Sequence, residues 1–544
     1  MTGITKKWFA SGEPWVWLNA AAVSTSIIMV LGLLLLIAAN GLGHFWPEAI
    51  MQAQLDEGNG ASTIIGEIRE IEAIPAELAH QEQAKRILFK VGNRDLNRLD
   101  FRWVAEHDLS HRFYPPEILT IERREWGNLY GRLLALNIEG NEVVQGAEAF
   151  QELQVRVQQN NQLYEQIKKI KVNEIGAINY QLEKLRLQQK KLILDGKLTD
   201  KNIALINAQR LELEHRYALL QEKLLGLQEQ LQQDMAVIEV SNGQKLNIGL
   251  SEIVQAYQPN AMTLMAKLRH YFKQIGHFIS DDPREANTEG GVFPAIFGTI
   301  LMVIIMSIIV TPLGVIAGIY LHEYANQGIV TQLVRIAVNN LAGVPSIVYG
   351  VFGLGFFVYF LGGSLDALFY PEASPAPVFG APGLLWASMT LAILTLPVVI
   401  VSTEEGLARI PNSIREGSLA LGATQAETLW RTILPMASPA MMTGLILAVA
   451  RAAGEVAPLM LVGVVKLAPS LAIDGNAPFL HLERQFMHLG FHIYDVGLQS
   501  PNIEAARPLV FATALLLVLV IVLLNITAIA LRNNLREKYK GLED

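Results

Sequence analysis

The chain has 544 residues, of which 51% are hydrophobic and 17% are charged, and its net charge is −8 at neutral pH. This composition is typical of a protein that lies partly in a membrane and partly in water. The chain contains no cysteine, which excludes a disulfide framework, a thiolate metal site and a cysteine nucleophile. The negative charge argues against nucleic acid as a partner, because nucleic-acid binders neutralise phosphates with basic surfaces.

An apolar stretch near the N-terminus predicts the first membrane span. Residues 17–39 are nearly uncharged and follow Lys6 and Lys7. At about 1.5 Å per residue, such a helix crosses a hydrocarbon core of about 30 Å. The two lysines favour a cytoplasmic N-terminus, and the span has no A-x-A-like cleavage site, so it is expected to be an anchor rather than a removed signal peptide. Residues 1–40 are therefore predicted to form the cytoplasmic N-terminus and the first transmembrane helix.

Residues 41–291 form the one large water-exposed region that the sequence predicts, and the topology places this region in the periplasm. Short β-like runs separated by turn residues occupy 41–146 and return in 236–291. We expect the two segments to be parts of one β-rich domain, the second of them ending in a linker helix.

The intervening segment, 147–235, predicts an inserted antiparallel coiled-coil hairpin. Apolar residues recur there at alternating steps of four and three, the spacing of coiled-coil a and d positions. The two series are Leu213, Tyr217, Leu220, Leu224, Leu227 and Leu231, and Ile175, Ile178, Leu182 and Leu185. The turn-like DGKLTDKN at 195–202 separates the two helices. A spacer or a self-association arm is favoured over a ligand site for this hairpin.

Five further apolar stretches, with the first, make six predicted spans. They lie at 294–320, 333–361, 384–402, 435–465 and 509–531. Threading the spans from a cytoplasmic N-terminus puts loop 403–434 and the tail 533–544 in the cytoplasm. Both of these segments contain arginines, whereas the outside loop 362–383 has no Lys or Arg. The charge bias therefore agrees with a multi-pass inner-membrane protein whose membrane domain is 292–532 and whose two termini are cytoplasmic.

The cytoplasmic loop ends in EGSLALGATQAETLWRTILP, residues 416–435. We expect this stretch to form two short helices with a hinge at Gly422. Pro435 is expected to start the next span, where its missing N–H costs nothing. Small residues on the first piece leave a shallow face that another protein can approach closely. An ordinary amphipathic interfacial helix is the alternative.

This stretch resembles the EAA signature of ABC-importer permeases. The positions that match the signature, or that belong to the small-residue face of the loop, are Glu416, Gly417, Ser418, Gly422, Ala423, Leu434 and Pro435. Two departures stand out, because Gly417 and Ser418 replace two alanines and the Ile of the signature is displaced to Ile433. The resemblance implies that the loop is a coupling helix, which sits in a cleft of a cytoplasmic ATPase and transmits its closure to the spans.

The flanking segments narrow the resemblance to phosphate-specific permeases of the PstA type. They are GGVFPAIFGT at 290–299, NNLAGVPSIVYGVFGLGFF at 339–357, the stretch 391–424, and RAAGEVAPLMLVG at 451–463. The resemblance covers 290–531 and, by position, the anchor helix. It implies the type I ABC-importer permease fold and four kinds of partner: the bilayer, a second permease of the PstC type, two ATPases of the PstB type, and a periplasmic phosphate-binding protein of the PstS type. Residues 41–289 depart from the family, so their function is not implied.

Arg451 and Glu455 are ionisable residues inside the fifth predicted span. At positions i and i+4 they share a helix face, and ionisable residues in a span are costly enough to indicate function. A guanidinium group suits two-point binding of phosphate oxygens. A mutually neutralised ion pair that only fixes helix packing is the alternative. Because RAAGE lines the translocation path in the resembling family, we favour a path role, with the passing anion competing with Glu455 for Arg451.

Asn340 and Ser346 are further path candidates, because with Pro345 they put polar groups and a helix breaker into the third predicted span. A structural kink is the favoured alternative. The chain has no G-x-x-x-x-G-K-[ST] motif, and its histidines lack metal-ligand spacing. We therefore expect no catalytic residue, metal site or cofactor in this chain, with ATP and Mg²⁺ bound by the partner ATPase.

Together these features predict an α-helical membrane protein with six spans and a periplasmic β-rich domain that carries the coiled-coil hairpin. The predicted function is that of a permease subunit of an ATP-driven phosphate importer, not of an enzyme. Permeases for other oxyanions (sulfate, molybdate or phosphonate) are an alternative within this class. An envelope scaffold or sensor that acts through the coiled coil is the alternative from another class.

Overall fold

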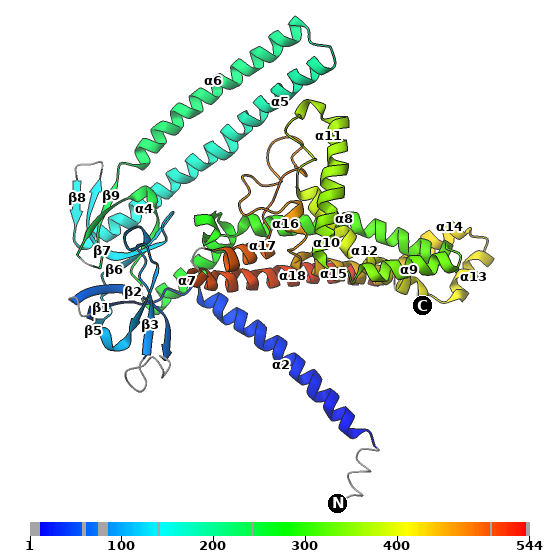
Figure 1. Cartoon of the computed structure of the whole chain (residues 1–544), viewed down its shortest axis with the longest axis horizontal. Coiled ribbons are helices and arrows are strands. Elements are labelled where there is room, and N and C mark those ends of the chain that lie inside the picture. The colour runs from blue at the N-terminus through cyan, green and yellow to red at the C-terminus, as the bar shows by residue number, and fades with distance from the viewer. Residues whose placement is uncertain are drawn as a thin grey trace, which may run out of the picture.

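The computed structural model describes residues 11–56, 61–73, 85–138, 142–241, 243–500 and 503–539. Figure 1 shows a β-rich region, a long helical hairpin that projects from it, and a bundle of membrane-type helices beside both. Lys6 and Lys7, on which the predicted orientation rests, lie outside the described residues, as do the last residues of the predicted tail, 540–544.

The β-rich region consists of two antiparallel sheets, which confirms the predicted β character of this part of the chain. Their strand orders are β4-β3-β2-β1-β5 and β10-β9-β7-β6-β11, and β8 pairs with β7. The strands are β1 Ile50–Asp56, β2 Ala61–Ala73, β3 Lys85–Lys90, β4 Phe101–Ala105, β5 Leu109–Phe113, β6 Ile118–Arg123, β7 Asn128–Ile138, β8 Glu142–Gln145, β9 Met235–Glu239, β10 Lys245–Gly249 and β11 Ile253–Tyr257. The second sheet therefore combines strands that precede the hairpin with strands that follow it.

A buried hydrogen bond joins the two sheets. The Tyr130 hydroxyl on β7 donates to Glu67 Oε1 on β2 at 2.7 Å, and Arg69 pairs with the same carboxylate at 2.7 Å. Burial alone raises the pKa of Glu67, but Arg69, Lys90 and the Tyr130 hydroxyl together outweigh it and hold that pKa below its usual value. Glu67 is therefore a charged, fully partnered group between the sheets.

Glu67→Gln should destabilise the β-rich region by about 1–3 kcal/mol at pH 7, because the variant loses a charge-assisted contact. Since the folded-state pKa lies below the ordinary value of 4.5, this stabilisation is present above pH 4.5 and is lost as pH falls through the folded-state pKa. Hydrogen exchange of β2 and β7 in the full chain measures the difference. The exposed Glu70→Gln is the matched control, and a difference that does not change with pH would contradict the assignment.

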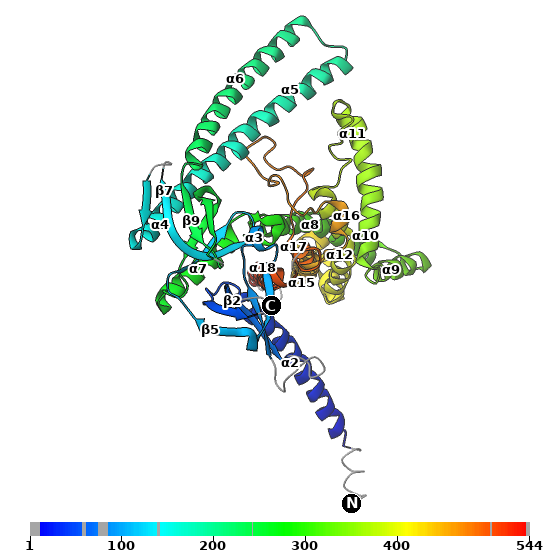
Figure 2. The same cartoon turned by 60° about the vertical axis from the view of Figure 1, so that its left-hand side comes forward.

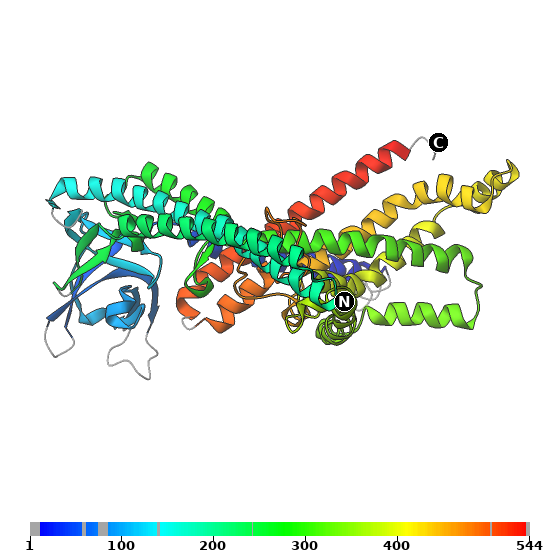
Figure 3. The same ribbon diagram turned by 90° about the horizontal axis from the view of Figure 1, so that it is seen from above.

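The hairpin leaves the second sheet after β8 and returns to it at β9. Its outgoing arm is a continuous helical run of α4 (Ala147–Lys169), the π-helical turn η2 (Ile170–Ile175) and α5 (Gly176–Leu194), and its returning arm is α6 (Asp200–Leu231). Along α6, Leu213 is 8% exposed whereas Leu211 is 70% exposed. One face of α6 is thus covered and the opposite face is open. Figures 1 and 3 show both arms running from the β-rich region toward the bundle.

The outgoing arm contacts the outer loops of the helical bundle. The Tyr180 hydroxyl on α5 donates to the Ala477 carbonyl at 2.7 Å, and its ring meets the edge of His481 with 5.8 Å between the ring centres. Further along α5, Lys191 lies 3.8 Å from Glu372. The hairpin is therefore held at two loops, and Figure 2 shows α5 on the side that faces the bundle.

Six helical runs among the described residues are long and apolar enough to cross a membrane, which confirms the predicted number. They are Trp15–Gly43, Phe293–Tyr324, Ser346–Phe369, Leu384–Ala408, Gln425–Gly454 and Ala506–Asn534. The corresponding elements are α2 (Glu13–Gly43), α8 with η5 (Phe293–Ile319, Tyr320–Tyr324), α10 with η6 and α11 (Ser346–Phe352, Gly353–Gly362, Gly363–Phe369), α12 (Leu384–Ala408), α14 with η8 and α15 (Gln425–Thr428, Leu429–Ile433, Leu434–Gly454), and α18 (Ile503–Tyr539). Between them lie α9 (Ile329–Leu341), α13 (Asn412–Ala420), α16 (Leu459–Val462) and α17 (Leu489–Tyr494), and α7 (Leu264–Ser280) precedes α8.

The predicted limits of the third span, 333–361, are wrong. The helix α9 stops at Leu341, and the span begins only at Ser346 and continues to Phe369. Pro345 has the extended ψ of 134° and precedes the first residue of α10. Since proline lacks an N–H and its ring restricts the residue before it, it ends one helix and starts another.

The predicted limits of the fifth span, 435–465, are also wrong. The helical run begins at Gln425 and ends at Gly454, after which Glu455 is extended. Pro435 therefore lies inside the run instead of starting it. The wider π-helical turn η8 comes directly before α15, where the proline has no N–H to donate to the preceding turn.

The core of the bundle is the close packing of α8, α12 and α15. A Cβ on Gly444 of α15 would lie 2.5 Å from Ser402 Cβ, and a Cβ on Gly318 of α8 would lie 2.7 Å from Thr403 Cβ. Small residues at these positions let the helix backbones approach one another, as membrane helices commonly do. α18 packs against α15, whereas α2 touches α18 near Gly41 and then diverges from the bundle (Figure 1).

Candidate functional site

The end of the bundle that carries the predicted coupling loop, referred to below as the tip, is a short helix–turn–helix. α13 ends at Ala420, and Gly422 adopts φ 90°, a left-handed conformation that favours glycine. The next helix begins with a capping box, in which Thr424 Oγ1 accepts a hydrogen bond from Glu427 N at 3.2 Å and Glu427 Oε2 accepts one from Thr424 N at 3.0 Å. Ser418 and Thr428 share a hydroxyl hydrogen bond of 2.9 Å across the turn. The turn is thus closed by local contacts.

Arg415 anchors this tip to the membrane helices. Its guanidinium group donates to Glu323 Oε1 at the end of η5 at 2.9 Å, and to the carbonyls of Leu407 and Ile410 at 2.9 and 3.0 Å. One side chain therefore ties α13 to the ends of η5, which continues α8, and of α12. The sequence analysis missed this role, and the separation of 92 residues between Arg415 and Glu323 gives no local signal for it.

The predicted coupling residues fall into two groups. Glu416, Gly417 and Gly422 are exposed at the tip, and Ser418 and Ala423 are partly buried beside them. The other two, Leu434 and Pro435, are partly buried within the helical run of the fifth span. The first group therefore lies at the tip, and the second lies in the helical run that leads away from it.

Apolar side chains and a small hollow complete the surface of the tip. Leu421 is 91% exposed and Trp430 is 70% exposed. A cavity of about 150 Å³ opens beside them between η5, α13 and the start of the fifth span. Exposed apolar side chains around a hollow are typical of a surface that binds another protein.

Arg451 and Glu455 lie at the other end of the same helical run. Arg451 Nε is 3.5 Å from Glu455 Oε1, and the two side chains are 32% and 21% exposed. Arg451 occupies the last turn of α15, so the guanidinium lies at the helix end where the backbone dipole favours a cation. The structure thus brings the two predicted path residues together, but at a helix end rather than within a continuous helix.

Ser346 and Asn340 lie on opposite sides of the break between α9 and α10. Ser346 is the first residue of α10, a helix that packs against the segment after Glu455, since a Cβ on Gly350 would lie 2.7 Å from Pro458 Cα. Asn340 is exposed on α9, and no contact joins it to Arg451. α10 therefore stands beside the chain segment that carries Glu455.

A second ion pair near the same end of the bundle was also missed by the sequence analysis. Arg335 of α9 contacts Glu404 of α12 at 3.1 Å and donates to the Leu321 carbonyl at 3.0 Å. Glu404 thus holds α9 against the bundle. In the part of the chain that the structure describes, no group of three or more His, Asp or Glu side chains is arranged to hold a metal ion.

Comparison with known proteins identifies the family. Residues 310–540 match the family described as "Binding-protein-dependent transport system inner membrane component". "Probable ABC transporter permease protein YqgI" of Bacillus subtilis is 30% identical over 235 residues, which cover 42% of this chain and 74% of that protein. The chain belongs to this family. It is accordingly a multi-pass ABC transporter permease component and not an enzyme.

Several relatives of this permease are phosphate transport proteins. "Phosphate transport system permease protein PstA 1" of Mycobacterium tuberculosis is 31% identical over 45% of this chain and 71% of its own length. These matches confirm the resemblance to PstA-type permeases. "Probable ABC transporter permease protein YqgH" of Bacillus subtilis is 33% identical, and the permease spans 59% of its length.

If Arg415 holds the tip, Arg415→Ala and Glu323→Ala should loosen it to a similar extent, because each variant removes the same ion pair. The chain has no cysteine, so one spin label at Ser413→Cys on α13 reports the mobility of the tip by electron paramagnetic resonance. Both variants should increase label mobility, and Arg431→Ala on the exposed side of η8 should not. Unchanged mobility in both variants would show that the ion pair does not position α13.

Proposed function

We propose that the chain is a permease subunit of an ATP-driven phosphate importer and forms half of its translocation path. The observation that carries this proposal is the Arg451–Glu455 pair at the broken end of α15, in a chain whose relatives include PstA-type permeases. Six spans put both termini on the same side of the membrane. The arginines of loop 403–434 and of the tail favour the cytoplasm for that side, so in this proposal the termini are cytoplasmic and residues 41–291 are periplasmic.

The geometry of the pair suits transient anion binding. The 3.5 Å separation of Arg451 Nε from Glu455 Oε1 exceeds the roughly 2.7–2.9 Å of a strong charge-assisted hydrogen bond. The guanidinium is therefore only loosely held and keeps other N–H groups for a ligand, and its planar fork matches two phosphate oxygens. Glu455 balances the arginine when the path is empty, and an arriving anion replaces it.

The cytoplasmic tip is the proposed docking site for the energy source. Leu421 and the small residues Gly417, Ser418 and Ala423 present a surface that a cleft in an ATPase can enclose. Because the same helical run connects this tip with Arg451, closure of the ATPases reorients the path residues. The proposed partners are a second permease of the PstC type, two ATPases of the PstB type that bind ATP and Mg²⁺, and a periplasmic binding protein of the PstS type.

Labelled phosphate uptake in cells that depend on this subunit tests the substrate. Arg451→Gln should lower uptake by about 10- to 100-fold without lowering membrane abundance, because it removes a charge-assisted contact to the anion. Glu455→Gln should retain more uptake than Arg451→Gln, because it removes only the carboxylate that competes with phosphate for Arg451. Arsenate alone should compete with phosphate. Competition by sulfate, molybdate or a phosphonate would assign another oxyanion, and full uptake by Arg451→Gln would reject the proposed path.

Substitutions at Gly422 test coupling separately from the path. Gly422→Ala places a side chain at φ 90°, which costs about 1–2 kcal/mol and should distort the tip. The expected result is reduced uptake together with weaker copurification of the ATPase. Gly422→Asn is the matched variant and should be milder, because asparagine tolerates left-handed conformations. No atom lies within 4 Å of a Cβ built at this position, so neither Ala nor Asn is blocked sterically. Equal effects of the two variants would therefore show that backbone strain is not the cause.

A further inference from the structure

Two adjoining cavities lie where the β-rich region meets the ends of two membrane helices. The inner cavity has a volume of about 170 Å³ and the outer one of about 470 Å³. They share the lining residues His44, Glu48, Arg69 and Lys90. The two therefore form one cleft, and we refer to its parts as the inner and the outer cavity.

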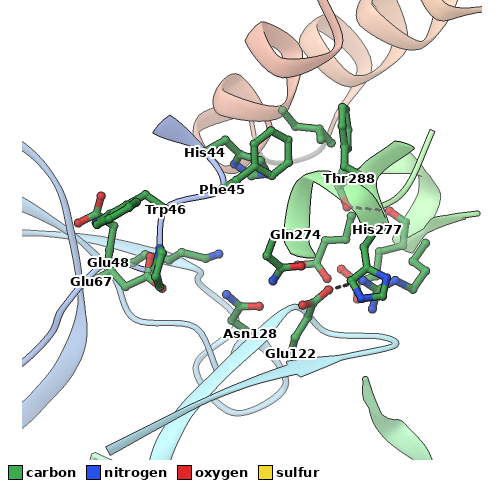
Figure 4. Close-up of a pocket in the computed structure, with 18 of the residues that line it drawn as sticks. His44, Phe45, Trp46, Glu48, Glu67, Glu122, Asn128, Gln274, His277 and Thr288 are labelled. Carbon is green, nitrogen blue, oxygen red and sulfur yellow. Dashed lines mark hydrogen bonds and ion pairs between the residues drawn. The ribbon is translucent and has the colours of Figure 1, made fainter. Parts of the chain in front are cut away.

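The inner cavity is polar and most of its charges are paired. Figure 4 shows His44, Phe45 and Trp46, which follow α2, on one side, and Gln274 and His277 of α7 on the other. Its carboxylates are matched to arginines in the ion pairs Glu67–Arg69 and Glu122–Arg284, and Arg94–Glu285 and His277–Asp281 lie at its rim. Because each of these pairs joins one acidic and one basic group, together they contribute little net charge to the inner cavity.

Five charged groups that line the cleft form no ion pair within the described residues. Two are the cations Lys90 and Arg507 of α18, and neither forms a hydrogen bond with another side chain in the described ranges. Two are the exposed carboxylates Glu48 and Glu70. The fifth is Glu289 on the short strand β13 (Glu289–Gly290), which has a buried Oε2 without a hydrogen-bond partner among the described residues. Burial raises the pKa of Glu289 to about 7. The cleft therefore contains two unmatched cations and one unmatched carboxyl group with a buried oxygen.

The histidine between the two cavities adds no charge. Burial, helped by Arg69 and Lys90, lowers the pKa of His44 to about 3, so the ring is neutral at physiological pH. Its Nδ1 has no partner within the described part of the chain. A buried polar atom without a partner normally marks the place of a water or a ligand.

The outer cavity lies at the depth of the membrane surface. It is lined by the last turn of α2, with Ala39, Asn40 and Gly43, and by the first turns of α18, with Arg507 and Phe511. Leu88, Phe101 and Pro508 add apolar walls. Because both helices are membrane spans, an apolar groove between their outer ends faces lipid chains and the cations above it face phosphates.

We propose that this cleft binds the head group of a phospholipid with a primary ammonium group, whose phosphate contacts Lys90 and Arg507 and whose ammonium contacts Glu289. The acyl chains run down the outer cavity between α2 and α18. This arrangement gives Lys90, Arg507 and the buried carboxyl oxygen of Glu289 partners of opposite charge, whereas the exposed Glu48 and Glu70 are left to water. The bound lipid then joins the β-rich region to two spans, next to the direct contact of α2 with α18 at Gly41.

Native mass spectrometry of the purified full chain in detergent tests the proposal. Phosphatidylethanolamine, phosphatidylcholine and phosphatidylglycerol with the same acyl chains are titrated separately. Phosphatidylethanolamine should bind about tenfold more tightly than the other two, because choline has no N–H to donate and glycerol carries no positive charge. Equal binding of the three lipids, or none, would overturn the proposal.

Two sets of variants locate the contacts. The double variant Lys90→Gln/Arg507→Gln should weaken the binding of all three lipids by about tenfold or more. Glu289→Gln should remove only the preference for phosphatidylethanolamine. The exposed Lys245→Gln on β10 is the matched control and should change nothing. Competition with inorganic phosphate tests whether the site binds the phosphate of a lipid head group or free phosphate. Displacement of lipid at millimolar phosphate, or lipid binding unaffected by the variants, would reject a head-group site.

Discussion

The close contact of α8, α12 and α15 is the constraint on which the rest of the bundle depends. At Gly444 and Gly318 the neighbouring helices leave no room for a Cβ, so the backbones of these helices pack against one another directly. α12 ends beside the carbonyl groups that Arg415 holds, and the run that contains α15 extends from the tip to Arg451. In the proposed mechanism, a displacement of the tip therefore reaches Arg451 through packed helices.

Two helix breaks set the geometry around Arg451 and Glu455, the residues of the proposed path. α9 ends before Pro345, where the Tyr349 hydroxyl donates to the freed Leu341 carbonyl at 2.6 Å, and α15 ends at Gly454. Unpaired backbone groups are tolerated at membrane depth only where protein or a water-filled cavity satisfies them. The two breaks are neighbours, since α10 packs against Pro458, and both lie beside ionisable or hydroxyl side chains. The two helix breaks and the Arg451–Glu455 pair therefore lie together in one part of the fold.

Apolar stretches were enough to predict six spans, and short β-like runs separated by turn residues were enough to predict a β-rich region, because both signals are local in sequence. The span limits at 333 and 465 were wrong, since composition does not show where Pro345 or Gly454 ends a helix. Glu416 to Ala423 were predicted at the cytoplasmic tip by their pattern, but the Arg415–Glu323 and Arg335–Glu404 pairs connect distant elements and leave no periodic trace. The cleft around Lys90 and Glu289 combines residues from many segments, so only the assembled fold reveals it.

The hairpin contacts the loops of the permease at Ala477 and Glu372, which ties the insertion to the membrane domain. The central claim, however, is that the tip at Leu421 docks on an ATPase. The most direct measurement is photo-crosslinking from benzoylphenylalanine placed at Leu421, which is 91% exposed, in the assembled transporter, with the same residue at Leu211 of the hairpin as control. The account predicts an adduct with the ATPase from Leu421 and none from Leu211. An adduct with lipid alone from Leu421 would contradict it.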